Sequence, residues 1–298
     1  MFMDKSDKYY PNNIEILFKY TIIYYIVIQL KGFRIMNIIV CVKQVPASSK
    51  VQVDPVTGVL IRDGADSKLN PFDLFALESA FSIAENVGGT VKTLSMGPPP
   101  AKAALDETLW MGADEAVLLS DRKFGGADVA ATASALKLGI EKMGDYGLII
   151  CGKQTTDGDT AQVGPELAEK LGIDHIANVI EIVEATEEYI TVVADMDRVL
   201  QTAKLKLPCL ITIDKDANTP RLPSYRRKLE FQQKESVKVY SVNDLEGADE
   251  NVLGLKGSPT KVERIFSPEK NLDRRMLTGS SEELSDNIYT LLKSKKFI

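Results

Sequence analysis

A polar turn that contains glycines holds the residues of this chain best suited to chemistry. Residues 152–163 read GKQTTDGDTAQV and lie between an apolar run at 147–151 and a helical pattern at 161–171. The apolar run is typical of a parallel strand buried on both faces. A turn at the carboxyl end of such a strand can point backbone N–H groups and the positive end of a helix at an anion. The turn is therefore predicted to bind a nucleotide phosphate; an ordinary loop made polar by solvent is the alternative.

Two common nucleotide-binding motifs do not describe this turn. Residues 147–154 read G-x-x-x-x-G-K-Q, and a Walker A loop ends in the serine or threonine that holds magnesium. The four residues between its glycines are apolar and belong in a strand, so they cannot form an open phosphate-binding loop. The chain also lacks G-x-G-x-x-G. The residues predicted to bind the nucleotide are Gly152, Lys153, Gln154, Thr155, Thr156, Asp157, Gly158, Asp159, Thr160, Ala161, Gln162 and Val163.

The composition of the chain excludes several classes of function. A formal net charge of -6 and a pI near 5.1 argue against a nucleic-acid surface, and we expect a soluble, cytoplasmic, metabolic protein. Cys41, Cys151 and Cys209 each lie in apolar runs, as expected of small buried side chains in a reducing compartment. His175 is the only histidine, and no paired His/Cys spacing occurs. Neither a metal site nor histidine-based catalysis is predicted.

The first 35 residues differ in character from the rest of the chain. Their densest apolar part, 22–28, is far shorter than the ~20 residues of a membrane-spanning helix. No small-residue cleavage site follows it, so a signal peptide is not predicted either. Met36 directly precedes the apolar run 37–42, a natural first strand. We therefore expect residues 1–35 to be a leader outside the working fold, arising from an over-long reading frame.

From Met36 onward, apolar runs alternate with helical patterns in the way typical of a doubly wound, mostly parallel α/β sheet. Asn70 is predicted to cap a helix that begins at Pro71. Prolines at 98–100 turn the chain out of the second strand, so the next helix also begins at the carboxyl edge of the sheet. The predicted elements are strands at 38–42, 91–96, 115–119 and 148–151, and helices at 71–86, 100–111 and 129–143.

The pattern changes after residue 171. Apolar runs at 176–183, 189–194 and 209–213 are predicted to form a β-hairpin extension of the sheet. Beyond residue 223 the sequence becomes polar and discontinuous and ends in a predicted helix at 281–295. This tail cannot form its own core, but some of its apolar positions need a partner surface. These positions are Val262, Ile265, Phe266, Leu284, Ile288 and Leu291.

This pattern divides the chain from Met36 onward into two predicted parts. We predict an α/β nucleotide-binding domain at 36–225 and an extended C-terminal arm at 226–298 that wraps over another subunit. A loose, solvated extension is the alternative for the arm.

Five short motifs in order resemble the β subunit of electron transfer flavoprotein. They are NIIVCVKQVP at 37–46, NPFD at 70–73, SMGP at 95–98, GKQ at 152–154 and DKDANTPR at 214–221. The resemblance covers residues 36–297. It implies a flavodoxin-like or adenine-nucleotide-binding fold, paired with an α subunit that carries FAD.

The turn resembles one of two branches of that family. In the classical branch the β subunit binds AMP, and its turn is richer in acidic residues. Here residues 157–165 read DGDTAQVGP, which is similar to the electron-bifurcating branch, where the β subunit binds a second FAD that takes hydride from NADH. Gly158 removes bulk and negative charge near a diphosphate. Residues 254–260, GLKGSPT, also resemble the arm of that branch, whereas Ala47 departs from the acidic residue expected after Pro46.

The resemblance also implies further site residues. Cys41, Asn70 and Met96 match positions that contact the adenine nucleotide, although core packing also explains Cys41 and Met96, and helix capping explains Asn70. Residues 214–223 resemble the loop that docks onto a dehydrogenase, with a solvated turn as the alternative. Ala217 matches a leucine anchor of the classical branch, which implies a different partner surface. The docking residues implied are Asp214, Lys215, Asp216, Ala217, Asn218, Thr219, Pro220 and Arg221.

The mechanism that the resemblance implies is electron transfer by flavin, without a catalytic side chain. NADH would reduce the FAD of this subunit, one electron would pass to ferredoxin, and the other to the FAD of the α subunit. The final acceptor would be a flavin-dependent dehydrogenase, such as a lactate, acyl-CoA or enoyl-CoA dehydrogenase. A classical carrier with structural AMP is one alternative. An ATP-hydrolysing or nucleotide-sensing protein on the same fold is another, but the missing Walker A serine or threonine argues against it.

Overall fold

The computed structural model describes residues 36–47, 52–53, 60–61, 67–231, 236–263 and 276–298. The predicted leader and two of the predicted apolar arm positions, Ile265 and Phe266, lie outside this set. The chain divides into two compact units, and the larger one extends to Lys261. Across the described ranges, no helix has both the length and the apolar character needed to cross a membrane.

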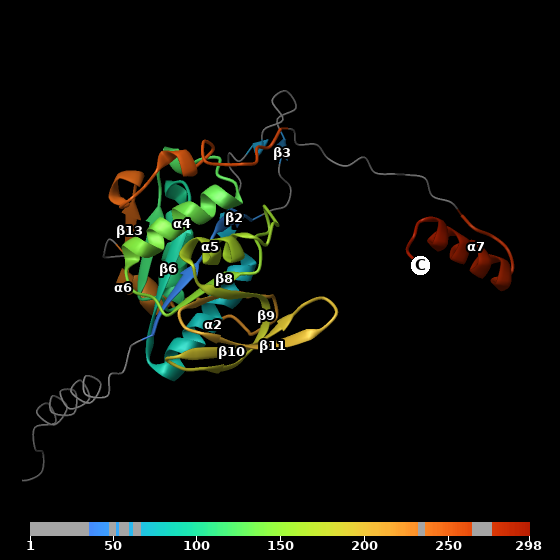
Figure 1. Cartoon of the computed structure of the whole chain (residues 1–298), viewed down its shortest axis with the longest axis horizontal. Coiled ribbons are helices and arrows are strands. Elements are labelled where there is room, and N and C mark those ends of the chain that lie inside the picture. The colour runs from blue at the N-terminus through green and yellow to red at the C-terminus, as the bar shows by residue number, and fades with distance from the viewer. Residues whose placement is uncertain (1–35, 48–51, 54–59, 62–66, 232–235, 264–275) are drawn as a thin grey trace, which may run out of the picture. The chain divides into compact units, whose positions relative to one another are not determined.

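A nine-stranded sheet forms the centre of the larger unit (Figure 1). Its strand order is β11-β10-β9-β12-β8-β1-β6-β7-β13. Neighbouring strands are parallel except at the β9–β10 and β10–β11 pairings. The strands are β1 (Met36–Cys41), β6 (Gly89–Met96), β7 (Glu115–Leu119), β8 (Leu148–Gly152), β9 (Asp174–Ala185), β10 (Tyr189–Asp195), β11 (Leu200–Lys206), β12 (Cys209–Ile213) and β13 (Val237–Tyr240). The predicted doubly wound, mostly parallel α/β fold is confirmed.

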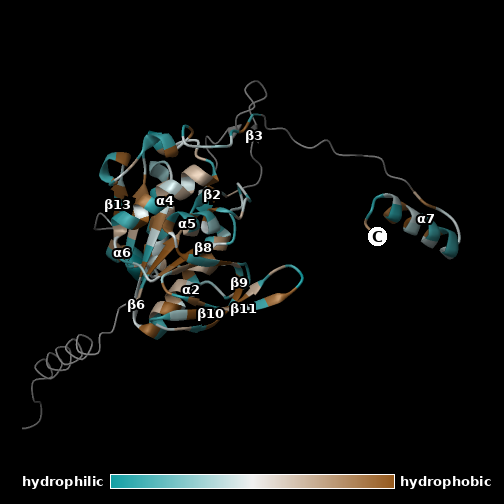
Figure 2. Cartoon of the chain, viewed as in Figure 1, coloured by the Kyte–Doolittle hydropathy of each residue, from teal (hydrophilic) through white to brown (hydrophobic). Residues whose placement is uncertain are grey.

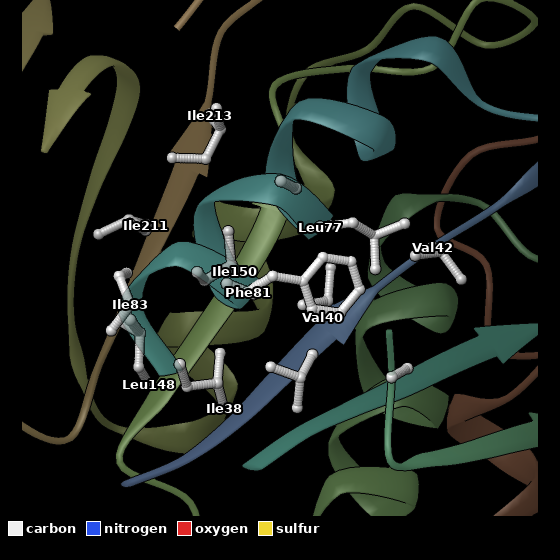
Figure 3. Close-up of a cluster of buried hydrophobic side chains, with 14 of the residues drawn as sticks. Ile38, Val40, Val42, Leu77, Phe81, Ile83, Leu148, Ile150, Ile211 and Ile213 are labelled. Atoms are coloured by element: carbon white, nitrogen blue, oxygen red, sulfur yellow. The ribbon is translucent and has the colours of Figure 1, made fainter. Parts of the chain in front are cut away.

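Helices cover both faces of the sheet, which explains why the central strands are apolar throughout. Helices α2 (Pro71–Val87) and α3 (Lys102–Met111) pack on one face, where Phe81 of α2 lies beside Val40 of β1 in the same buried cluster as Ile150 of β8 (Figure 3). Helices α4 (Val129–Met143) and α5 (Val163–Leu171) pack on the other face. Figure 2 accordingly shows hydrophobic central strands between helices of mixed colour.

The strand order reverses between β1 and β8. From β1 the chain adds β6 and then β7 on one side, and it then crosses back to place β8 on the other side of β1. Cys41 and Cys151, at the carboxyl ends of β1 and β8, lie in register as neighbours. Ligands of open α/β sheets bind outside the carboxyl ends of the strands at such a reversal. The predicted turn at 152–163 leaves β8 at this point.

The structure differs from the sequence-based expectation in the second half of the sheet. β9 and β10 form the predicted antiparallel hairpin, and β11 extends it (Figure 1). Residues 209–213, however, were predicted as part of that extension, and as β12 they lie parallel between β9 and β8. All five residues of β12 are buried, so its unbroken apolar sequence was the signal for a central strand.

Beyond residue 223, one strand and one α-helix were not predicted. β13 pairs in parallel with β7 at one edge of the sheet, and α6 (Tyr225–Phe231) packs beside α3. Residues following β13 are also attached to the larger unit, because Asp128 at the start of α4 accepts hydrogen bonds from the N–H (2.9 Å) and hydroxyl (2.8 Å) of Thr260. The predicted helix at 281–295 is present as α7 (Ser281–Ser294), with a capping box of Ser280 and Glu283.

The remaining described elements are short. They are strands β2 (Gln44–Pro46), β3 (Gln52–Val53), β4 (Leu60–Ile61) and β5 (Ser67–Leu69), and 3-10 helices η1 (Pro99–Ala101), η2 (Arg122–Phe124), η3 (Val242–Asp244) and η4 (Glu250–Val252).

Truncation of a central side chain should show how far the fold depends on β8. Ile150 is fully buried. We expect Ile150→Ala to lower the free energy of unfolding by about 2–5 kcal/mol, because the change leaves a cavity between helix and sheet. Val183→Ala is the matched control, since Val183 is 54% exposed and its loss should change stability by less than about 0.5 kcal/mol. Urea denaturation measures both, and equal effects would contradict the packing described above.

Candidate nucleotide-binding site

The turn at 152–163 begins where β8 ends and is held there by its main chain. The N–H of Lys153 donates to the carbonyl of Ile213 at the end of β12, at 2.8 Å. Residues 156–160 are exposed. Ala161 has a left-handed φ of 55°, and Gln162 is right-handed. Such alternation points successive N–H groups to one side, the pattern of an anion-binding nest. It also explains why α5 begins at Val163 and not at the predicted residue 161.

The amide of Asn70 fixes the turn against the start of α2. Asn70 is fully buried. Its Nδ2 donates to the carbonyl of Gln154 at 2.9 Å, and its Oδ1 accepts the N–H of Thr156 at 3.3 Å. Asn70 occupies the predicted N-cap position with Pro71 after it, but its side chain does not cap the helix. The predicted capping bond is therefore wrong, because the side chain is used to hold a turn 84 residues away.

Asp73, in the first turn of α2, belongs to the same hydrogen-bonded group. Its Oδ2 accepts the N–H of Lys43 at 2.7 Å, and its Oδ1 accepts Nδ2 of Asn70 at 2.9 Å. Burial raises the pKa of Asp73 to about 7 even though all of these donors favour the carboxylate. Asp73 was not among the site residues predicted from the sequence. The signal was present in the NPFD motif, as an acidic residue in the first turn of an apolar helix.

Both lysines of the site are bound to aspartates. Nζ of Lys43 lies 2.8 Å from Asp157, and Nζ of Lys153 lies 2.8 Å from Asp214. Partial burial opposes ionisation of Asp157, but the hydrogen bond and charge of Lys43 outweigh it and lower the pKa of Asp157. Since each lysine is neutralised locally, an anion must be attracted mainly by other groups.

Backbone N–H groups are the strongest remaining donors. The first N–H groups of a helix have no intrahelical partner, and at the start of α5 they belong to Val163 and Gly164. Pro165 follows and has no N–H to offer. The N-terminal end of α5 carries the positive end of the helix dipole toward the turn. The hydroxyls of Thr155, Thr156 and Thr160 add donors of the kind that phosphate oxygens accept.

The structure brings Cys41 and Met96 to the same edge. Cys41 ends β1 and Met96 ends β6, and both pack with the cluster under α4 and α5. Cys41 lies beside Cys151 on the neighbouring strand, and the interaction between the two thiols together with burial raises the pKa of Cys151. The ends of three neighbouring strands therefore meet beside the turn. Across the described ranges, no group of three or more His, Cys, Asp or Glu residues is placed to hold a metal.

Gly152 and Gly158 differ in whether their surroundings have room for a side chain. A Cβ on Gly152 would collide with Oδ1 of Asp73 and would lie 2.8 Å from the carbonyl carbon of Phe72. A Cβ on Gly158 would meet only the hydroxyl of Thr155 at 3.4 Å and Nζ of Lys43 at 4.0 Å. Gly152 is thus required for close packing of β8 on α2, whereas a Cβ on Gly158 would make only ordinary van der Waals contacts.

The loop at 214–221 is fastened to α2. Nδ2 of Asn218 donates to the carbonyl of Phe75 at 2.9 Å, and Arg221 makes ion pairs with Glu78 at 2.8 Å and Glu85 at 2.7 Å. These two carboxylates raise the pKa of Arg221. Ala217 is partly buried against the core, so the position matching a leucine anchor does not project outward. The loop residues that are exposed are Lys215, Asp216 and Thr219.

The sheet, its point of reversal and this turn define the chain as a doubly wound α/β protein of the nucleotide-binding kind. Comparison with known proteins agrees. The family model described as "Electron transfer flavoprotein domain" matches residues 57–245. The electron transfer flavoprotein subunit beta of Thermoanaerobacterium thermosaccharolyticum is 45% identical over 263 residues, which are 88% of this chain and 100% of that protein.

Two further relatives have other names. Protein FixA of Bradyrhizobium diazoefficiens is 42% identical over 83% of this chain and 88% of its own length. The caffeyl-CoA reductase-Etf complex subunit CarD of Acetobacterium woodii is 40% identical over 88% of this chain and 100% of its own length. The chain belongs to the β-subunit family of electron transfer flavoproteins. Membership of that family implies flavin or AMP binding and an α-subunit partner.

Substitution of the two glycines tests the packing of the site. We expect Gly152→Ala to lower the free energy of unfolding by about 1–3 kcal/mol, because its Cβ overlaps Asp73 and the α2 backbone. Gly158→Ala is the matched control and should change stability by less than about 1 kcal/mol. Thermal unfolding of both variants measures the difference. If Gly152→Ala were as stable as the control, the described contact between β8 and α2 would be wrong.

Asp73 should make stability depend on pH in a particular direction. Its pKa is about 7 in the folded protein against 3.8 for a free side chain, so the folded state holds this proton more tightly than the unfolded state. Its contribution to stability is complete below pH 3.8 and is lost as the pH rises to about 7. The stability of the wild type relative to Asp73→Asn should therefore fall over this range, by at most about 1.4 kcal/mol per pH unit, and level off above it. Urea denaturation of both proteins at a series of pH values measures this difference in stability. If the difference rose or stayed constant with pH, the raised pKa of Asp73 would be contradicted.

Proposed function

We propose that this chain is the FAD-binding, NADH-oxidising β subunit of an electron-bifurcating electron transfer flavoprotein. The observation that carries the proposal is the turn at the point of sheet reversal, where Gly158 stands at an exposed tip and an added Cβ would have no neighbour closer than 3.4 Å. An acidic side chain at this tip would repel a diphosphate, and glycine removes both its charge and its bulk. One relative is named as a subunit of a caffeyl-CoA reductase-Etf complex, which supports a role within a larger redox complex.

The residues present fit a phosphate-bearing cofactor. The N–H groups of Val163 and Gly164 and the threonine hydroxyls of the turn would hold the phosphates. Cys41 and Met96, at the ends of β1 and β6, would line the adenine side of the site. Asn70 would act behind the turn, since its amide is occupied by Gln154 and Thr156.

The protein supplies position, and the cofactor supplies the chemistry. When bound, FAD would accept hydride from NADH and release electrons singly, one to ferredoxin and one toward the FAD of the α subunit. None of the side chains of the site is suited to nucleophilic catalysis, because both thiols near the turn are buried and the raised pKa of Cys151 keeps it protonated. Asp73 is enclosed beneath the turn and serves to hold the backbone.

The remaining parts of the chain would provide the partner contacts. We propose that the C-terminal arm, residues 226–298, wraps over the α subunit through the part beyond Lys261, where Ile288 and Leu291 of α7 are exposed. The loop that begins at Asp214 would dock a flavin-dependent dehydrogenase, of the lactate, acyl-CoA or enoyl-CoA type. The complex is proposed to work in the cytoplasm.

The classical carrier, with AMP in place of FAD, is the second candidate. Asp157 and Asp159 lie in the turn, and their charges favour an anion with one phosphate over an anion with two. ATP hydrolysis is not proposed. Gln154 stands where a Walker A loop needs a hydroxyl, and Lys153 is bound to Asp214.

Nucleotide content separates the two candidates. We expect residues 36–298, co-expressed with the α subunit and denatured after purification, to release two FAD and no AMP per heterodimer. NADH should then bleach the flavin absorbance of the native complex and reduce ferredoxin. One FAD and one AMP per heterodimer would overturn the proposal in favour of the classical carrier. Chromatography of the released nucleotides with absorbance detection makes the measurement.

A further inference from the structure

Asp214 begins the loop that resembles a docking segment, but its carboxylate faces the nucleotide turn. Its Oδ2 lies 2.8 Å from Nζ of Lys153, and its Oδ1 accepts the N–H of Lys215 at 2.7 Å. Its own N–H donates to the carbonyl of Val179 in β9, at 2.8 Å. The side chain is 14% exposed, so little of it is available to a partner protein.

Lys153 is tied to the same strand end twice. Its N–H donates to Ile213, directly before Asp214, and its ammonium group binds the carboxylate of Asp214. The lysine side chain is 29% exposed, so this pair is shielded from solvent and salt more than a typical surface pair. By comparison, Lys43 in the other ion pair of the site is 44% exposed. Two bonds therefore hold Lys153, the second residue of the turn, at the start of the loop.

Both the start of the turn and the far end of the loop are also attached to α2. Asn70, at the N-terminal end of this helix, holds Gln154 and Thr156 of the turn. Further along the helix, Glu78 binds the guanidinium and the N–H of Arg221. The turn, the helix and the loop are thus each bonded to the other two. Among the described contacts, the Lys153–Asp214 pair is the only direct bond between a turn side chain and a loop side chain.

We propose that Asp214 is a positioning residue for the nucleotide turn, acting through Lys153, and that this ion pair couples order in the turn to order in the docking loop at 215–221. The inference rests on the proposed binding of a nucleotide at the turn. Because coupling between two sites is reciprocal, a nucleotide that orders the turn also orders the loop, and a docked partner strengthens nucleotide binding. The exposed residues Lys215, Asp216 and Thr219 are left as the docking surface.

Hydrogen–deuterium exchange of the heterodimer tests the coupling without a known dehydrogenase. The nucleotide-depleted complex is measured alone and after saturation with FAD or AMP, and peptides covering 152–163 and 215–221 are followed. In the wild type, nucleotide should slow exchange in both peptides, by about tenfold in the loop. In Asp214→Asn and in Lys153→Gln, a higher nucleotide concentration should be needed to protect 152–163, and the added protection of 215–221 should be lost. The double variant should lose no more than either single variant.

Two control variants separate coupling from general loosening. Asp214→Glu keeps the carboxylate and should restore protection of the loop, and Lys215→Gln removes a neighbouring exposed charge and should leave the response unchanged. Full loop protection in Asp214→Asn, or none in the wild type despite protection of 152–163, would overturn this inference alone. Absence of nucleotide protection at 152–163 in the wild type would overturn the proposed function and this inference with it.

Discussion

The amide of Asn70 is the interaction on which the candidate site most depends. It is buried and satisfied at both of its polar atoms, by Asp73, Gln154 and Thr156. An unsatisfied buried amide costs about 1–3 kcal/mol, so these bonds are maintained together or not at all. Through them the start of α2 and the turn after β8 are held as one body. The long, exposed tip of the turn can therefore keep a fixed place at the edge of the sheet.

The charged side chains of the site bind one another or backbone N–H groups, so the site has little net charge. Lys43 is paired with Asp157, Lys153 with Asp214, and Asp73 is surrounded by N–H donors. Attraction for an anion then comes from main-chain N–H groups and the start of α5. Such a site can bind a cofactor firmly without presenting an acid, base or nucleophile to it. This is the division of labour expected where the cofactor performs the electron transfer.

Sequence reasoning found the elements of the site but not the bonds between them. Apolar runs such as Leu148–Gly152 are readable because both faces of the central strands are buried. The role of Asn70 was missed because its partners lie 84 and 86 residues away, and local sequence favours a cap. The pairing of Lys153 with Asp214, 61 residues apart, was hidden for the same reason. Hydrophobic periodicity does not determine which strands a given strand pairs with. The parallel placement of Cys209–Ile213 could therefore not be predicted from it.

The most direct test of the site is a crystal structure of the heterodimer purified with its own nucleotide. Phosphate oxygens are expected within hydrogen-bond distance of the N–H groups of Val163 and Gly164, with Asn70 still bonded to Gln154 behind the turn. A second FAD at this edge would also agree with the bifurcating role. Phosphates bound elsewhere on this subunit, with no contact to residues 152–164, would contradict the assignment of the turn.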